Sequence, residues 1–199
     1  MINTISKPTW FFKSIDVPNI DKIKEECMAV FYKHYPDVFG NRGFTFTYVD
    51  QDILRLEAPT YIDYLKSLGL YDRWGKSVLI GTKGQERLKD SPIHVDSEDW
   101  KERSYALNIP LINCENSHTV WYDVKDLDPD AYSGDDQTAK GYKSARGFNP
   151  ATSKEIARLE TANPAWINVS IPHRAENTND NLRLIISTRF WPEIHDYFI

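Results

Sequence analysis

Two histidines, one aspartate and one arginine have the residue types and the spacing of a metal-centred site. His94 and Asp96 lie two residues apart, and His173 and Arg183 follow later in the chain, ten residues apart. Two imidazoles and one carboxylate can hold a divalent ion from one side and leave its other positions open. The planar guanidinium of Arg183 can grip a carboxylate beside that ion through paired hydrogen bonds. We therefore expect a metal held by the first three residues and an acidic cosubstrate held by Arg183.

The spacing of the ligands predicts that strands present them. Residues two apart on a strand point to one face, so His94 and Asp96 can meet one ion while Val95 faces an apolar layer. We expect His173 at the end of a strand over 165–171. Each fragment alone is weak, because a surface His-x-Asp pair and a turn histidine are both common. Their joint occurrence favours a site, and this ligand set is typical of oxidative chemistry at iron(II).

The arginine strand offers two candidate anchors. Arg183, Ile185, Ser187 and Arg189 alternate along the run 182–190 and therefore share one strand face. A buried arginine without a partner is costly, so an inward Arg183 needs an anion. That anion is either a ligand carboxylate or an internal acidic side chain, and both interpretations stay open. Arg189 is the competing anchor for the cosubstrate.

Nearby residues have plainer interpretations. His118 follows Asn116 and Ser117, which are typical of a turn, so we expect an exposed loop position rather than a metal ligand. Trp121 lies on a predicted strand and is more often a core aromatic than part of a cosubstrate pocket.

The elements that must position these residues form a mainly β chain with helices near its start. Apolar residues at helical spacing after Pro18 predict a helix that ends near His34, and a second helix is expected over 59–70. Alternating or short apolar runs predict strands. These runs cover 9–15, 44–49, 77–82, 93–96, 105–111, 119–123, 155–160, 165–171 and 182–190. The pattern predicts an α+β fold, mainly β, with an antiparallel core and helices packed outside.

Length and composition limit the classes of protein. The 199 residues predict a single domain, with a strand and supporting helices in 1–75 and a β core carrying the metal site in 76–199. A net charge of −5 argues against a general nucleic-acid binder. The two cysteines, Cys27 and Cys114, indicate reduced thiols rather than a disulfide framework. Since neither a secretory signal nor a membrane span is visible, we expect a cytoplasmic protein.

The polar segment 126–150 separates the two halves of the metal motif. It is rich in Asp, Gly and Lys, and a connection of this length is commonly functional or mobile. We interpret it as a lid or substrate loop over the mouth of the core.

On the residues His94-x-Asp96, His173 and Arg183, the chain resembles the Fe(II)- and 2-oxoglutarate-dependent oxygenases. The similarity is closest to the prolyl/aspartyl hydroxylase-like branch, including small bacterial and phage members, and covers about 77–190. The resemblance implies a double-stranded β-helix, a cupin-like jelly roll. It implies Fe(II) on the three ligands, 2-oxoglutarate on Arg183, and a dioxygenase that hydroxylates a small molecule or a protein side chain. The family often has Ser or Thr two residues after the arginine, where this chain has Ile185.

Two other function classes stay open at this point. One is a cupin-like metalloprotein of different chemistry, although such sites more often use three or four mainly histidine ligands. The other is a non-catalytic jelly-roll binding or virion protein. The expected partners are 2-oxoglutarate, dioxygen and a substrate that the sequence does not specify, and the oligomeric state is equally open.

Overall fold

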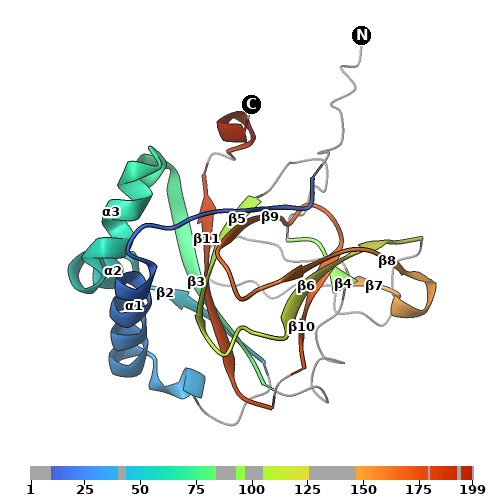
Figure 1. The fold of residues 1–199 in the computed structure, drawn as a ribbon, viewed down its shortest axis with the longest axis horizontal. Helices are drawn as coiled ribbons and strands as arrows, with labels where there is room; N and C mark the ends of the chain where they lie inside the picture. The colour runs from blue at the N-terminus through green and yellow to red at the C-terminus, as the bar shows by residue number, and fades with distance from the viewer. Residues whose placement is uncertain are drawn as a thin grey trace.

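Two antiparallel sheets face each other, and three helices cover the outer side of the larger sheet (Figure 1). The computed structural model describes residues 10–39, 44–83, 93–96, 105–125, 147–178, 180–191 and 194–198. No helix within these ranges is long and apolar enough to cross a membrane.

The larger sheet has six strands and the smaller sheet has five. In spatial order the larger contains β1 (Phe12–Ser14), β9 (Ala165–Asn168), β5 (Tyr105–Ile112), β11 (Arg183–Phe190), β3 (Trp74–Thr82) and β2 (Phe44–Val49). The smaller contains β7 (Gly147–Phe148), β4 (Ile93–His94), β10 (His173–Asn177), β6 (Ser117–Asp123) and β8 (Lys154–Glu160).

The order of the strands is that of a jelly roll. From β3 the chain crosses to β4 in the smaller sheet, returns to β5, crosses to β6 and β8, returns to β9, crosses to β10 and ends on β11. Two four-stranded sheets connected in this way form the eight-stranded double sheet of a jelly roll. The predicted fold class, mainly β with helices outside a sandwiched antiparallel core, is therefore confirmed.

The helices are α1 (Ile20–His34), α2 (Gln51–Glu57) and α3 (Pro59–Ser67). Short 3₁₀ turns cover Pro36–Phe39, Tyr71–Arg73, Pro150–Thr152 and His195–Phe198. Asp50 caps α2 by accepting a hydrogen bond from the Asp52 amide at 2.7 Å. Pro59 opens α3, and because a residue before proline avoids helical geometry, it also separates the two helices.

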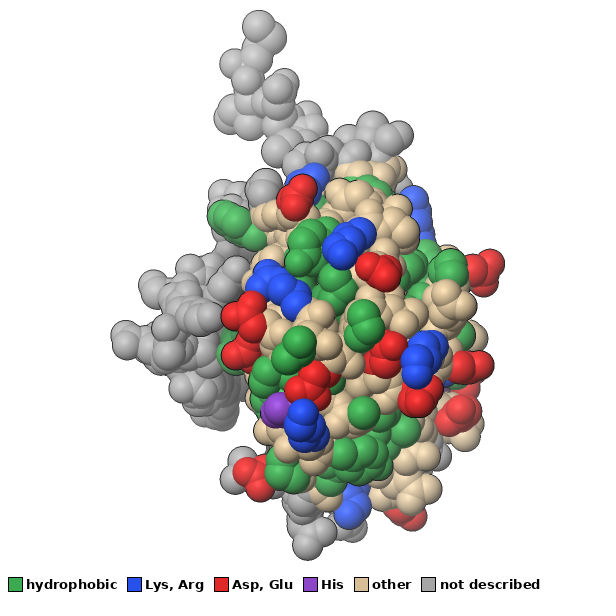
Figure 2. Space-filling model, turned by 90° about the vertical axis from the view of Figure 1, so that its left-hand side faces the viewer, with side chains coloured by type: hydrophobic (Ala, Val, Ile, Leu, Met, Phe, Trp, Pro, Cys, Tyr) green, Lys and Arg blue, Asp and Glu red, His purple; other side chains and the backbone are tan. Residues whose placement is uncertain are grey.

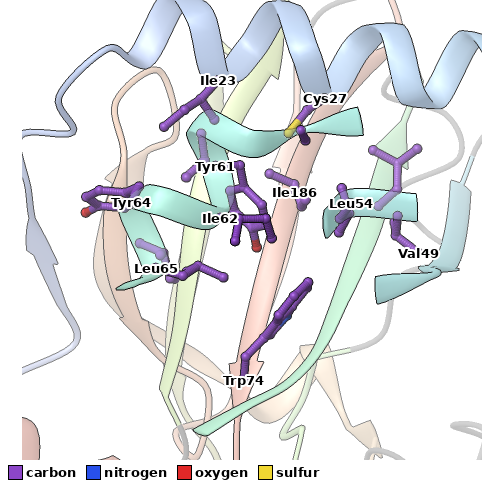
Figure 3. Close-up of a cluster of buried hydrophobic side chains, with 14 of the residues drawn as sticks. Ile23, Cys27, Val49, Leu54, Tyr61, Ile62, Tyr64, Leu65, Trp74 and Ile186 are labelled. Atoms are coloured by element: carbon purple, nitrogen blue, oxygen red, sulfur yellow. The ribbon is translucent and has the colours of Figure 1, made fainter. Parts of the chain in front are cut away.

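The helices pack their apolar faces onto the larger sheet. Figure 3 shows Ile23 and Cys27 of α1, with Tyr61 of α3, above Ile186 of β11. All of these side chains are buried. On the outward side of the helices, acidic and basic side chains are interspersed among apolar ones (Figure 2). Pairs three residues apart, such as Lys22 with Glu25, lie on this solvent side.

The structure corrects several predicted boundaries. The predicted strand over 165–171 ends at Asn168, and His173 begins a separate strand, β10, instead of ending the previous one. The sequence pattern missed β10 because its outward side chains, Arg174 and Glu176, are charged. It also missed α2, a helix of seven residues with only Leu54 buried.

Most of the predicted lid, 126–146, lies outside the described residues. Its last residues are described, and they do not form a plain loop. Gly147–Phe148 form β7, which pairs with β4, so that Gly147 lies opposite His94. The end of the segment therefore lies beside the strand that carries the first predicted ligand.

Candidate metal centre

His94, Asp96 and His173 meet in one place. Each offers one ligand atom, and these atoms all lie within 4.8 Å of one another. The strand register explains the meeting, because His173 of β10 pairs directly with His94 of β4. The two imidazole centroids are 4.7 Å apart. Two adjacent strands and the bend that follows β4 thus bring together three groups that the sequence had only suggested as a site.

Asp96 reaches the site from a bend rather than from a strand. β4 contains only Ile93–His94, so the predicted four-residue strand is wrong in its second half. The Asp96 amide instead donates a hydrogen bond to the Val169 carbonyl at 3.0 Å, which holds the bend in place. Val95 is buried among Ile93 and other apolar side chains, as predicted.

The two oxygens of Asp96 have different surroundings. Oδ1 lies 3.1 Å from Nε2 of His94 and 4.0 Å from Nε2 of His173. Oδ2 accepts a hydrogen bond from the Arg189 guanidinium. One oxygen therefore faces the histidines while the other is held by a cation from the larger sheet. This arrangement favours Asp96 as a one-oxygen ligand, which leaves more of a metal's positions open.

A backbone contact fixes the ring of His173. Its Nδ1 lies 2.8 Å from the Ile171 carbonyl oxygen, which can only accept a hydrogen bond. Nδ1 therefore carries the proton, and Nε2 presents its lone pair toward His94 and Asp96. Histidine ligands of metals are commonly oriented in this way through their second nitrogen.

The charges of the site suit a cation. Burial opposes ionisation of Asp96, but the Arg189 charge and the His94 hydrogen bond outweigh it and hold the pKa of Asp96 well below its usual range. Burial lowers the pKa of His173 to about 4, although Asp96 opposes that shift. At neutral pH the site therefore combines a carboxylate with a neutral imidazole, which are the protonation states that bind a metal.

Arg183 lies in the interior between the two sheets. Its side chain is fully buried, its Nε donates to Thr161 Oγ1 at 3.2 Å, and its Nη1 and Nη2 make no hydrogen bond. The nearby thiol of Cys114 carries no formal charge, since burial raises its pKa. A buried guanidinium with two unpaired nitrogens matches the predicted anchor for a carboxylate.

Other unpaired polar atoms lie on the same inner surface. Ser187 of β11 is the register partner of Asn108 on β5, and both are buried. Ser187 Oγ, Asn108 Oδ1 and Thr82 Oγ1 all lack a hydrogen-bond partner. Buried polar atoms are normally satisfied, so a group of unpaired ones points to a polar ligand. Asn108 and Ser187 are thus available in place of the hydroxyl that Ile185 lacks.

Asn177 of β10 links the two sheets at the end of the interior where Arg183 lies. Its Nδ2 donates to the Thr82 carbonyl at 3.0 Å, and its Oδ1 accepts from Ser117 Oγ at 3.1 Å. Four residue steps along β10, about 13 Å, separate this end from His173. Since Arg183 pairs with Thr82, it lies at the Asn177 end, whereas the metal ligands lie at the other.

Two neighbouring predictions have different outcomes. His118 is not in an exposed loop but on β6, where it is half-buried between Glu160 and Glu176. His118 alternates with the inward-facing residues of β6, so it is on the outer face of the smaller sheet and does not join the metal ligands. Trp121 is a core aromatic, as expected, and its indole N–H donates to the Asn168 carbonyl at 2.8 Å.

Sequence reasoning missed the contact between Arg189 and Asp96. The strand alternation placed Arg189 on the correct face, but nothing in the sequence brings β11 over the bend that follows β4.

The donor set fits iron(II), and the unpaired guanidinium nitrogens of Arg183 fit a carboxylate. Two imidazoles and one carboxylate on one side of an ion form the facial arrangement used by non-haem iron proteins. The unpaired nitrogens of Arg183 fit a second carboxylate on the same inner surface. Both predicted groups therefore agree with the residues that the structure brings together.

The fold is similar to those of several non-haem oxygenases. Similar chains include the epimerase SnoN in complex with Fe3+, alpha-ketoglutarate and nogalamycin RO, with 13% identity, a TM-score of 0.49, and coverage of 90% of this chain and 78% of that chain. A Pseudomonas putida prolyl-4-hydroxylase has 9% identity, a TM-score of 0.42 and 92% coverage of both chains. No family model and no curated protein matches the chain. Proteins of the superfamily that the motif resembles thus occur among the structural neighbours.

Proposed function

We propose that this protein is an Fe(II)- and 2-oxoglutarate-dependent dioxygenase that hydroxylates a small molecule or a protein side chain. The proposal rests on one observation, which is the convergence of the three predicted ligand atoms within 4.8 Å. The orphaned guanidinium of Arg183 on the same inner surface supports it. When bound, iron(II) with 2-oxoglutarate and dioxygen supplies the oxidising power, and 2-oxoglutarate is converted to succinate and CO2.

In this proposal each residue has a physical task. His94 and His173 supply imidazole nitrogens, and Asp96 supplies one oxygen while Arg189 restrains the other. Arg183 pairs with the distal carboxylate of 2-oxoglutarate. The attraction between these two charges is stronger in the buried interior than in water. Asn108 and Ser187 offer hydrogen bonds along the inner surface between the two ends.

The ligand set also weighs against the two alternatives. Of the five histidines, only His94 and His173 belong to the cluster among the described residues, whereas cupin sites of other chemistry more often use more histidines. The unpaired Nη1 and Nη2 of Arg183 point to an anionic ligand, and a jelly roll that only bound this anion would not need the three converging metal ligands.

Anaerobic titration followed by a product assay tests the proposal. Purified protein is titrated with Fe(II) and then with 2-oxoglutarate, and succinate is measured after air is admitted with a panel of candidate substrates. We expect binding of one equivalent of each and succinate formation that requires both. Absence of Fe(II) binding by the folded protein would overturn the proposal.

A pair of arginine variants tests the role of Arg183. Arg183→Met should weaken 2-oxoglutarate binding by about 2–3 kcal/mol, the scale of a hydrogen-bonded charge, while leaving Fe(II) binding intact. Arg174→Met is the matched control, because Arg174 pairs with Glu176 on the smaller sheet and is not among the metal ligands. Normal 2-oxoglutarate affinity in Arg183→Met would move the anchor to Arg189.

A further inference from the structure

The orientation of the Asp96 carboxylate is not fixed by its own backbone. Asp96 lies in the bend after β4, and its amide donates a hydrogen bond to the Val169 carbonyl at 3.0 Å. That bond holds the main chain, but the last torsion of an aspartate side chain is broad, so the carboxylate can still turn about its final bond. Contacts made by the two oxygens must therefore set which oxygen faces the histidines.

Arg189 makes such a contact from the larger sheet. Its guanidinium donates to Oδ2 of Asp96, while Oδ1 lies 3.1 Å from His94 Nε2. Hydrogen bonds between a guanidinium and a carboxylate are charge-assisted and directional. The two side chains are only 17% and 24% exposed, so solvent screens this pair less than it screens one at an open surface. Among the described residues no second acceptor takes the buried Nη1 of Arg189.

The strand that carries Arg189 is irregular at this point. Between Arg189 and Phe190 the register of β11 with β3 shifts by one residue, at Gly75. Such a β-bulge bends a strand and re-aims a neighbouring side chain, and bulges are over-represented beside active sites. On its other side Arg189 pairs with Ala106 of β5, whose side chain is small. A bulge thus lies where Arg189 leaves its strand to meet Asp96.

A cation in this position opposes metal binding. Arg189 and a divalent ion held by Oδ1 would repel each other across a single carboxylate. A side chain present to strengthen metal binding would be neutral or acidic rather than basic. The contribution of Arg189 therefore lies in how the ligands are arranged or in the stability of the fold, and these two roles predict different measurements.

The number of oxygens that Asp96 offers decides how many positions of the ion stay open. A carboxylate can bind a metal ion through one oxygen or through both. In octahedral coordination two imidazoles and one carboxylate oxygen leave about three positions open, and the second oxygen would take one of them. Since 2-oxoglutarate and dioxygen would share these positions in the proposed function, a position lost to Asp96 is lost to a reactant.

We propose that Arg189 is a positioning residue that keeps Asp96 a one-oxygen ligand and thereby keeps one more position of the metal open. This inference rests on the proposed metal site and adds the residue that sets its coordination. Arg189 acts through Asp96, because it holds Oδ2 by a hydrogen bond while Oδ1 faces the histidines. Without Arg189, Oδ2 is free to turn toward the ion and bind it as well.

Counting the waters on bound Mn(II) tests the role of Arg189. Water-proton relaxation is measured on the wild-type protein and on Arg189→Met, each loaded with Mn(II) and without 2-oxoglutarate. We expect about three exchangeable waters in the wild type and about two in Arg189→Met, because an octahedral ion loses a water when both oxygens of Asp96 bind. Equal counts in the two proteins would overturn the inference. About two waters in the wild type would also overturn it, whether or not the variant folds.

A control variant and a second measurement separate positioning from general support. Arg158→Met also removes an arginine that pairs with carboxylates, those of Glu155 and Glu176, but away from the metal ligands, and it should keep the wild-type count. Arg189→Met should bind Mn(II) at least as tightly as the wild type, because the substitution removes a like charge. Weaker Mn(II) binding would show that Arg189 supports the whole ligand set, and would overturn the inference.

The same titrations distinguish a failure of this inference from a failure of the proposed function. If the folded wild-type protein does not bind Mn(II), the proposed metal site fails, and the inference fails with it. If Mn(II) binds and the water count does not depend on Arg189, the inference alone fails. That second result is also expected if Arg189 is the anchor for 2-oxoglutarate, because an anchor has no effect on the ion before the cosubstrate is added.

Discussion

The two faces of β11 differ in how completely their side chains are satisfied. Toward the helices, Leu184 and Ile186 lie in a dry apolar core. Toward the smaller sheet, Arg183 and Ser187 are buried with unpaired polar atoms. One strand therefore contributes stability on one side and a polar surface prepared for ligands on the other. Changes on the first face should act on folding, and changes on the second should act on binding.

The largest effect is expected at the metal ligands. His94→Ala should weaken Mn(II) binding at least about a hundredfold, because loss of an outer partner of a ligand alone costs up to that amount. Isothermal titration measures the affinity. His118→Ala is the control, since this histidine is also in the smaller sheet but lies outside the cluster. An equal loss of Mn(II) affinity in the two variants would contradict the assignment of His94, but not His118, to the metal site.

The helix-side face should be the more sensitive to truncation. Ile186→Ala should lower the free energy of unfolding by about 3 kcal/mol, the middle of the range for deleting a buried aliphatic side chain. Ser187→Ala, the next residue, should cost little, because its hydroxyl has no partner to lose. Urea unfolding followed by circular dichroism compares the two. A larger loss in Ser187→Ala would reverse the assignment of the faces.

Lowering the pH should reduce the stability of the protein through His173, whose side chain faces the site. Burial gives His173 a pKa of about 4 in the folded protein, below the ordinary value of 6.5. The unfolded chain therefore binds a proton that the folded chain excludes between these values, so stability falls as the pH falls from 6.5 to 4. The loss should reach up to about 3 kcal/mol in metal-free protein. Urea unfolding at several pH values measures it, and His173→Gln should flatten the dependence.

Removing the buried cation should stabilise the ligand-free protein. Arg183→Met replaces a guanidinium with two unpaired nitrogens by an apolar side chain, and we expect a gain of about 1–2 kcal/mol in the free energy of unfolding. The same variant is expected to bind 2-oxoglutarate poorly, so stability and binding should change in opposite directions. Thermal unfolding without ligand provides the first measurement, and destabilisation would show that Arg183 is structural.

The smallest effect is expected where the helix side is polar. The Tyr61 hydroxyl hydrogen-bonds Ser77 Oγ at 2.8 Å and also meets Thr188 Oγ1, all within the core. Tyr61→Phe should cost about 1 kcal/mol, the typical net value of a hydrogen bond. Urea unfolding measures this loss, and metal affinity should not change. A loss of metal affinity in Tyr61→Phe would show that the helix side of the larger sheet influences the metal site on its other side.

Much of the fold followed from the sequence because its pattern is local. Alternation along 44–49 and 182–190 predicted β2 and β11 almost to the residue, and helical spacing predicted α1. β10 was missed because its outward residues are charged, and only its inward face contributes buried residues. A pattern in one segment cannot report the side chains that pack against it.

The same limit applies to the site. Residue type and spacing predicted His94, Asp96 and His173 as the metal ligands. The bend at Asp96 and its contact with Arg189 depend on how β11 lies over β4, which is set by tertiary packing rather than by local sequence.

The difference in burial between the two ends of the interior has a consequence for hydration. Arg183 is fully buried, whereas the side chains of His94 and Asp96 retain 23% and 24% exposure. A carboxylate that pairs with Arg183 must therefore give up nearly all of its bound water, and the attraction of the guanidinium has to offset that cost. A group at the metal ligands can keep part of its contact with water.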